Sequence, residues 1–276
     1  MDFGISTRCF GANPLTPDLL ERLRRANFRT IELHASVPGF DYHNRSLVRR
    51  IARWFPENEI PAPSLHLPFA EDPIGIRPVE RQRAFDEFKR CLELGDLVPL
   101  SFVVLHLGVA GQDFNPVSFE YTYAAISAIQ SFAGVRVLIE TLPNNIATFE
   151  RILEFKTAAQ ISNLGICYDT GHGEMDGPAD AIHLDDNLTW NLENGARPDD
   201  HLWPFEGARN WPAFVEQLVL SSFDGPLILE GQDDRLEKAA DSRSHLKDLL
   251  GEANDSMEEF RLKYNLPAPR QIEEDE

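Results

Sequence analysis

The sequence predicts a closed α/β barrel of eight parallel strands surrounded by helices, a (β/α)8 TIM barrel, from three observations. Eight short runs rich in apolar and β-branched residues recur along the chain. Segments with helical periodicity separate most of them, and this alternation is typical of βαβ units with a parallel sheet. The length of 276 residues is ordinary for one such barrel. The predicted strands cover residues 3–7, 30–34, 62–67, 102–107, 135–141, 164–169, 181–184 and 225–231.

Three of the connecting segments show a clear helical face. Their apolar residues recur three or four positions apart, so they share one side of a helix that can pack on the barrel. A doubly wound open sheet is the competing architecture, but it usually has fewer strands. It also usually carries a glycine-rich phosphate loop after its first strand, and none follows residues 3–7. The faces consist of Leu19, Leu20 and Leu23, of Leu47, Ile51, Trp54 and Phe55, and of Phe85, Phe88, Leu92 and Leu94.

The connection between the sixth and seventh strands departs from this pattern. Only residues 170–180 separate the two strands, so the sixth outer helix is expected to be short or missing. A long polar loop, residues 185–210, follows the seventh strand, and long ordered loops on barrels tend to be functional. We expect one barrel domain over residues 1–251. Residues 252–276 form a polar C-terminal extension, with a short helix over 256–265 and about ten disordered residues at the end.

The composition argues against several classes of protein. Acidic residues number 45 and basic residues 26, and the net charge of −19 repels nucleic acid on average, so no nucleic-acid partner is expected. No apolar run is long enough to span a membrane. The N-terminal segment MDFGISTRCF lacks the pattern of a secretory signal. Three sparse cysteines fit reduced thiols, and these features together predict a cytoplasmic protein.

Acids and histidines recur at the ends of the predicted strands. The strands of a parallel barrel end at one rim, so side chains from distant parts of the chain meet there. Five of the eight histidines fall at these positions or in the long polar loop. The strand-end set is His66, His106, Glu140, Asp169, His172, His183 and Glu230, and the loop adds Asp199 and His201.

This combination of side chains predicts a divalent metal site. A lone histidine at a strand end is more often a hydrogen-bonded core or surface residue, and a lone acid more often caps a helix. Several carboxylates buried together, however, repel one another in a low dielectric unless a cation compensates them. Carboxylates and imidazoles suit Zn, Mn, Fe or Co. We expect one to three ions, with Mn, Zn, Co and Mg as candidates.

The strand-end segments, taken in order, resemble the xylose-isomerase-like barrel superfamily. That group includes the sugar phosphate isomerase/epimerase-like proteins and the endonuclease IV-type enzymes. The resemblance spans roughly residues 3–232, with two departures. Asp185 stands where a second histidine is common, and the helix between the sixth and seventh strands is nearly absent. The segments are SLHLPF, VVLHLG, LIETLPNN, CYDTGHG, IHLDDN, DDHLWPFEG and LILEG.

The resemblance implies two ligand sets. In the ketose epimerases of the group, one divalent ion is held by residues that match Glu140, Asp169, His183 and Glu230 here. In the endonuclease IV-type enzymes, three zinc ions use these four and further ligands. The further positions match His66, His106, His172, Asp199 and His201.

Three functions are compatible with these sets. The favoured one is a metal-dependent sugar isomerase or epimerase of carbohydrate metabolism, in which Glu140 and Glu230 transfer a proton through a metal-stabilised enediolate. The second is a multinuclear zinc phosphodiesterase, in which a metal-bound hydroxide attacks phosphorus. The third is a catalytically silent metabolite-binding barrel, whose signature would be the loss of Glu140 or Glu230. One ion per chain favours the first function, two or three the second, and none the third.

The expected substrate is a ketose or related polyol, and a sugar phosphate is the alternative left open. Barrels of this group commonly form dimers or tetramers, so a homo-oligomer is left open, although no interface stripe stands out in the sequence. Weaker candidates for substrate contacts follow the first two strands or lie in the long loop. These are Arg8, Glu32, His34, Trp203 and Arg209.

Overall fold

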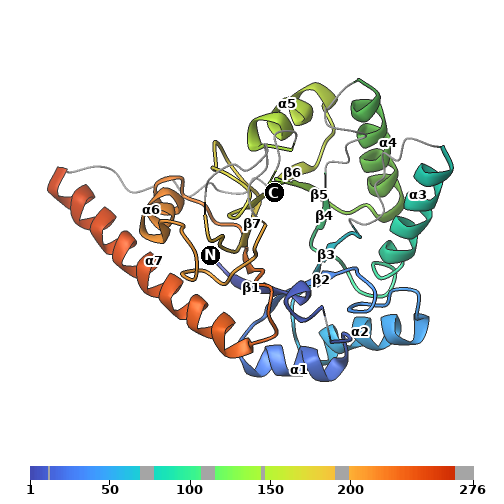
Figure 1. The fold of residues 1–276 in the computed structure, drawn as a ribbon, viewed down its shortest axis with the longest axis horizontal. Helices are drawn as coiled ribbons and strands as arrows, with labels where there is room; N and C mark the ends of the chain where they lie inside the picture. The colour runs from blue at the N-terminus through green and yellow to red at the C-terminus, as the bar shows by residue number, and fades with distance from the viewer. Residues whose placement is uncertain (12, 69–77, 107–115, 144–146, 190–198, 265–276) are drawn as a thin grey trace.

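Eight parallel strands pair in the order of the sequence in the computed structural model, and the last strand closes the sheet onto the first (Figure 1). The predicted (β/α)8 barrel is confirmed. The structure describes residues 1–276 except for residue 12 and residues 69–77, 107–115, 144–146, 190–198 and 265–276.

The strands are short and form the inner wall of the molecule, with the helices outside (Figure 1). Each strand is almost entirely buried, because helices cover one face and the barrel interior covers the other. The strands are β1 (Phe3–Ser6), β2 (Thr30–His34), β3 (Ser64–His66), β4 (Val103–His106), β5 (Val137–Glu140), β6 (Leu164–Asp169), β7 (Ala181–Leu184) and β8 (Leu227–Leu229).

Helices follow most of the strands. Residues 170–180, between β6 and β7, contain no helix, which confirms the expected reduction at this place. The helical elements are the 3-10 helix η1 (Thr7–Phe10), α1 (Pro17–Arg25), α2 (Arg45–Glu57), α3 (Pro78–Leu92), α4 (Pro116–Ala133), α5 (Phe149–Ala159), α6 (Trp211–Leu220) and α7 (Leu236–Tyr264).

Local sequence fixes where several helices begin. The side-chain oxygen of Thr16 accepts a hydrogen bond from the backbone N–H of Leu19 at 3.2 Å, and Pro17 occupies the first turn of α1. Thr148 caps α5 in the same way through the N–H of Arg151. Such caps satisfy backbone donors that have no partner within the helix, so they place the helix start at a defined residue.

A small apolar layer joins the strands β4 to β7. Its members each lie two residues before an acid or histidine at a strand end. Because alternate residues of a strand point to the same side, this layer forms the floor beneath the ionisable side chains. The layer consists of Val104, Leu138, Cys167 and Ala181, with Phe102 packed against it.

The final helix is unlike the others. α7 has 29 residues and runs across residue 251 without a break. It packs against α6 and then projects beyond the barrel (Figure 1). Among the residues that the structure describes, no helix combines the length and apolar character needed to cross a membrane.

Candidate metal centre

The pairing of the strands brings the predicted acids and histidines to one rim of the barrel. His106 and Glu140 are register partners on β4 and β5, and Asp169 and His183 are partners on β6 and β7. Glu140, Asp169 and His183 are almost fully buried. Ionisable groups therefore meet away from solvent, where each needs a compensating charge.

Four of these residues form a group that could hold one metal ion. Glu140, Asp169, His183 and Glu230 each offer one ligand atom, and these atoms lie within 4.8 Å of one another. Nδ1 of His183 is 2.9 Å from Oε1 of Glu140 and 3.1 Å from Oε2 of Glu230. Oδ2 of Asp169 and Oε1 of Glu230 are buried without a hydrogen-bond partner. Unpaired buried carboxylate oxygens are costly, and a divalent cation would satisfy them, so the donor set fits such an ion.

A second group adjoins the first through Glu140. Oε2 of Glu140 is 2.9 Å from Nε2 of His66 and 2.8 Å from Nε2 of His106. The three residues form another set of ligand atoms within 4.8 Å. Each oxygen of Glu140 thus faces a different group, so this carboxylate lies between two positions that could hold ions.

A third group lies on the other side of the rim. Oδ1 of Asp199 is 3.0 Å from Nε2 of His172 and 2.8 Å from Nε2 of His201. His201 has a left-handed backbone (φ 45°), which is uncommon outside glycine and is typical of strained functional positions. Behind it, Oδ2 of Asp185 lies 2.8 Å from Nδ1 of His201, although neither atom has the geometry of a hydrogen bond. Asp169, Asp185 and His201 therefore form a further possible ligand set.

The charges of the rim shift several pKa values strongly. Burial lowers the pKa of His172, but Asp169 and the hydrogen bond to Asp199 outweigh burial and raise this pKa to about 10. Burial likewise lowers the pKa of His201, but contacts with Asp185 and Asp199 raise it to about 11. Without a cation, protonated imidazoles thus compensate the acids. A metal ion would replace those protons, because imidazole binds metal only in its neutral form.

A cavity of about 260 Å³ opens at this rim. Its wall includes members of all three groups, together with Arg8, His34, Leu142 and Pro143. A space of this size accepts a small molecule, and its polar wall suits a ligand rich in oxygen atoms.

The structure places the weaker candidates for substrate contacts in different surroundings. Arg8 and His34 line the cavity. Glu32 is fully buried, and its Oε1 lies 3.2 Å from Nε2 of His183, so it supports that histidine from behind. Trp203 packs over Gly231 and donates from Nε1 to Asp233.

Arg209 is held by an aromatic cluster and the backbone. Its guanidinium lies 4.5 Å from the ring centre of Phe214 and donates to the carbonyl oxygen of Thr170 and to the hydroxyl of Tyr168. Neither Arg209 nor Trp203 is among the described residues that line the cavity. The guanidinium among the described residues of the cavity wall belongs to Arg8, whose Nε lies 4.0 Å from Oε1 of Glu230.

Sequence reasoning did not single out two apolar residues of the cavity wall. Leu142 and Pro143 follow two and three positions after Glu140 and give the wall an apolar segment. Their position directly after the strand end that carries the predicted ligand Glu140 is the feature that could have identified them. Residues there belong to the βα loops that build sites on such barrels.

Two relatives match the chain in sequence. Uncharacterized protein MJ1311 of Methanocaldococcus jannaschii is 25% identical over 277 residues, which cover 94% of this chain and 92% of the relative. Uncharacterized protein y4fM of Sinorhizobium fredii is 26% identical over 206 residues. That match spans 64% of this chain and only 64% of y4fM.

Solved structures share the fold. A D-tagatose 3-epimerase-like protein has a TM-score of 0.76 and 22% identity, over 93% of this chain and all of that chain. L-ribulose 3-epimerase has a TM-score of 0.72 and 16% identity, over 94% of this chain and 97% of that chain. The IOLI protein with a bound zinc atom has a TM-score of 0.72 and 18% identity, over 92% and 99%. These neighbours include sugar epimerases and a zinc-bound protein, and their likeness to this chain is one of fold.

A family model extends the match from the fold to the sequence. The model describes xylose isomerase-like TIM barrels and matches residues 20–249, which is most of the chain and includes all four members of the first ligand group. The chain therefore belongs to the xylose isomerase-like TIM barrel family.

Proposed function

We propose that this protein is a divalent-metal-dependent isomerase or epimerase that acts on a small polyhydroxylated molecule such as a ketose. The observation that carries the proposal is the convergence of two buried carboxylates, Glu140 and Glu230, on one face of His183, at 2.9 and 3.1 Å from its Nδ1. Both carboxylates line the cavity in which a substrate would lie.

The residues of this chain have complementary tasks in such a reaction. A divalent ion held by Glu140, Asp169, His183 and Glu230 would supply Lewis-acid polarisation of a substrate carbonyl. One of the two glutamates takes the proton from the adjacent carbon, and the other returns it, on the opposite face for epimerisation. A ligating carboxylate can act as a base only if its second oxygen remains free, so each glutamate would have to bind the ion through one oxygen. Glu230 fits this requirement better than Glu140, because Oε2 of Glu140 already contacts His66 and His106.

The electrostatics keep these carboxylates ionised. Burial alone would raise the pKa of Glu140, but His183 and His106 outweigh it and hold this pKa well below its usual range. Burial would also raise the pKa of Glu230, but His183 and Arg8 hold it well below its usual range. Both groups are therefore ionised in the metal-free chain, and a bound cation would favour the same ionised state.

The cavity supports a small-molecule substrate. Its volume of about 260 Å³ fits a monosaccharide-sized compound, and imidazole, carboxylate and guanidinium groups around it offer hydrogen bonds to hydroxyls. The net charge of −19 disfavours nucleic acid as a substrate.

A second candidate function is a multinuclear hydrolase of a small phosphate ester. One observation favours it: three further sets of ligand atoms adjoin the first, and two of them share Glu140 or Asp169 with it. In such an enzyme His66 and His106 would help to hold a second ion, and His172, Asp199 and His201 a third. These ions would supply a hydroxide at neutral pH and a clamp for the phosphate oxygens.

Metal content and a substrate screen separate these functions. The full chain is purified, its metal is measured by elemental analysis, and it is assayed with ketoses and with phosphodiesters in the presence of Mn, Co or Zn. One ion per chain with exchange of a substrate C–H proton in deuterated water supports the isomerase. Two or three ions with phosphodiester hydrolysis support the hydrolase. Failure to bind any of these metals contradicts both.

A further inference from the structure

The last turns of α7 carry an apolar stripe that is open to solvent. Its members alternate at spacings of four and three residues, which is the heptad spacing of helices that pack along one another. The first members are covered by the barrel and α6, whereas Phe260 and Tyr264 are 51% and 54% exposed. The stripe, here named the α7 stripe, consists of Leu246, Leu250, Ala253, Met257, Phe260 and Tyr264.

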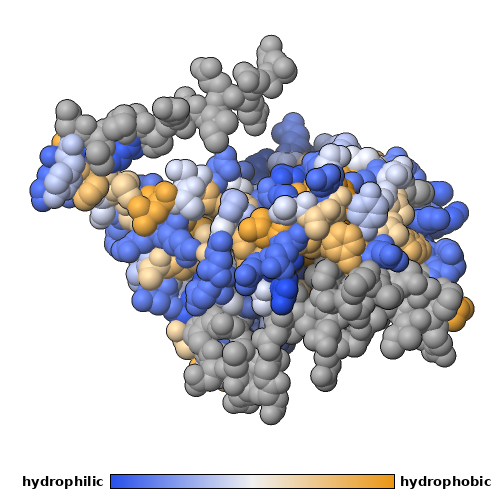
Figure 2. Space-filling view, turned by 90° about the horizontal axis from the view of Figure 1, so that it is seen from above, coloured by the Kyte–Doolittle hydropathy of each residue, from blue (hydrophilic) through white to orange (hydrophobic). Residues whose placement is uncertain are grey.

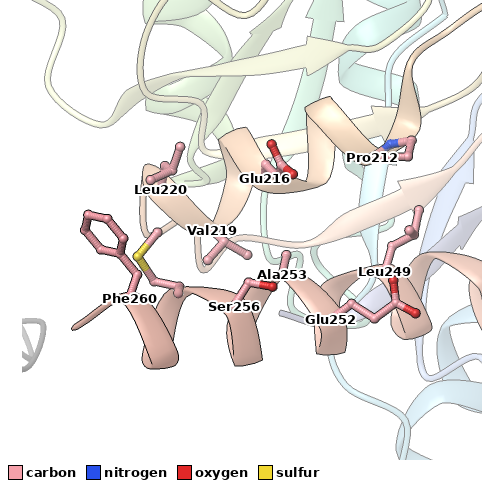
Figure 3. A pocket seen from close by; sticks show the side chains of 10 residues that line it. Pro212, Glu216, Val219, Leu220, Leu249, Glu252, Ala253, Ser256 and Phe260 are labelled. Carbon is pink, nitrogen blue, oxygen red and sulfur yellow. The ribbon is translucent and has the colours of Figure 1, made fainter. Parts of the chain in front are cut away.

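A groove lies beside the open half of the α7 stripe (Figure 3). It has a volume of about 440 Å³ and runs between the end of α6 and α7. Val219 and Leu220 form one wall, and Ala253, Met257 and Phe260 form the other. Leu220 is also largely exposed. In the space-filling view, the projecting end of α7 shows hydrophobic residues among hydrophilic ones (Figure 2). The groove and the stripe thus form one continuous apolar surface.

We propose that this surface is a homodimer interface, in which the α7 helices of two copies pack antiparallel about a two-fold axis. A two-fold interface uses the same patch on both subunits, so the patch must complement itself. This patch does, because it holds a projecting aromatic side chain, Phe260, directly beside a groove. A two-fold rotation near Met257 places Phe260 of each copy in the groove of the other.

The charges along α7 favour the antiparallel arrangement. The acidic part of the helix, Glu252 to Glu259, precedes a basic last turn that contains Arg261 and Lys263. Antiparallel packing sets this basic turn of one copy beside Glu252 of the other and beside Glu216, which also borders the groove. Parallel packing would place like charges together, which is destabilising.

The regular spacing also argues for a helix as the occupant. A stripe that repeats every 3.5 residues matches a second helix with the same repeat over several turns. The stripe is not apparent from the sequence, because its first half belongs to the barrel core and its second half lies in a segment of polar composition. Only the continuous helix across residue 251 joins the two halves.

The oligomeric state of the full chain tests this proposal. Sedimentation equilibrium of the wild-type chain is expected to show a reversible dimer. Phe260→Glu places a charge in the centre of the contact twice per dimer. The dissociation constant of the dimer should therefore rise by at least about 100-fold, the size typical of a central aromatic anchor. The matched control is Leu262→Glu, because Leu262 is 73% exposed and lies on the opposite face of α7. This control should keep the dimer.

A charge exchange tests the direction of packing. Lys263→Glu should weaken the dimer severalfold, because it places two acids beside each other across the interface. The double variant Glu252→Lys with Lys263→Glu should restore the dimer, since position 263 of each copy then carries an acid beside the lysine at position 252 of the other copy. A chain that ends at Tyr264 should still dimerise. A monomeric wild-type chain, a Phe260→Glu variant that dimerises normally, or a dimer lost on truncation after Tyr264 would each overturn the proposal. None of these outcomes bears on the metal centre, which shares no described lining residue with the groove.

Discussion

Oε1 of Glu140 on β5 lies 2.9 Å from Nδ1 of His183 on β7, so the contact reaches across the intervening strand β6. The other oxygen of Glu140 faces His66 and His106. Glu140 is therefore the point at which two possible ligand groups meet. Because its carboxylate contributes an oxygen to each group, a substitution of Glu140 tests both ligand groups at once.

Glu140→Gln should reduce the metal content of the protein, because it removes a negative charge from both groups while it preserves side-chain size. Turnover of a substrate found in the screen should fall by about 100-fold or more, the usual contribution of a positioned acid or base. Equilibrium dialysis followed by elemental analysis and steady-state kinetics measure the two effects. Glu174→Gln is the control, because Glu174 is an exposed acid on the connection between β6 and β7. Equal metal content in Glu140→Gln and wild type would exclude Glu140 as a ligand.

The stability of the metal-free protein should depend on pH in a defined direction. The pKa of His172 is raised to about 10 and that of His201 to about 11 from an ordinary value of 6.5. A raised pKa in the folded state gives stability that is fully present below about pH 6.5 and is lost as pH rises through about 10 to 11. The free energy of unfolding of chelator-treated protein should therefore decrease from about pH 6.5 towards pH 11. Urea unfolding at a series of pH values measures this decrease.

Asp199→Asn tests the cause of that decrease. The imidazoles of His172 and His201 both contact Oδ1 of Asp199. The same two contacts lower the pKa of Asp199, so the shifts of the three pKa values describe one set of interactions and are not added together. The variant should show a shallower loss of stability with pH. Asp200→Asn is the matched control, because Oδ2 of Asp200 accepts from the backbone N–H of Leu188 instead. An unchanged pH profile in Asp199→Asn would show that Asp199 does not contribute to the raised pKa values of the two histidines.

Arg8→Met should discriminate between charged and neutral substrates. Arg8 lines the cavity, and its Nη1 is buried without a hydrogen-bond partner. A guanidinium so placed can bind a phosphate or carboxylate of a substrate. We expect KM for an anionic substrate to rise by about 10-fold or more, the worth of a hydrogen bond to a charged group. KM for a neutral ketose should change little, and an equal rise for both substrates would assign Arg8 to general polar contacts.

The fold could be predicted from the sequence because its signals are local. Alternating apolar runs and helical faces give the barrel, and the eleven residues between Asp169 and Ala181 are too few for a helix with its connections. The positions of Glu140, Asp169, His183 and Glu230 at strand ends follow from the same pattern. Parallel strands present their ends at one rim, so their proximity did not depend on any detail of packing.

Features that depend on side-chain direction could not be predicted in this way. Arg209 is close in sequence to Asp199 and His201, but the aromatic surface of Phe214 and the carbonyl of Thr170 draw its guanidinium away from the cavity wall. The length of α7 could not be predicted from the sequence either. Its polar second half reads as a separate extension, and its heptad spacing becomes meaningful only when the helix is continuous.

Gly231→Ala should disturb both the packing and the metal centre. A Cβ at position 231 would lie 2.4 Å from Cδ2 of the buried Trp203 indole, which is too close for two carbon atoms, so the ring or the backbone must move. Overpacking of this kind costs about 1–3 kcal/mol. Because Gly231 directly follows Glu230, the displacement should also lower metal affinity. Urea unfolding and metal titration measure the two effects.

Gly251→Ala provides the matched comparison for that substitution. Gly251 lies inside α7, and a Cβ there meets no atom within 4 Å. Alanine restricts the unfolded chain and favours the helix, so this variant should gain about 0.5–1 kcal/mol and keep wild-type metal affinity. A loss of stability in Gly231→Ala together with a gain in Gly251→Ala would show that the close approach of Trp203 requires glycine at position 231. If both variants gained stability, the indole would have room to move, and the link from Trp203 through Gly231 to Glu230 would not hold.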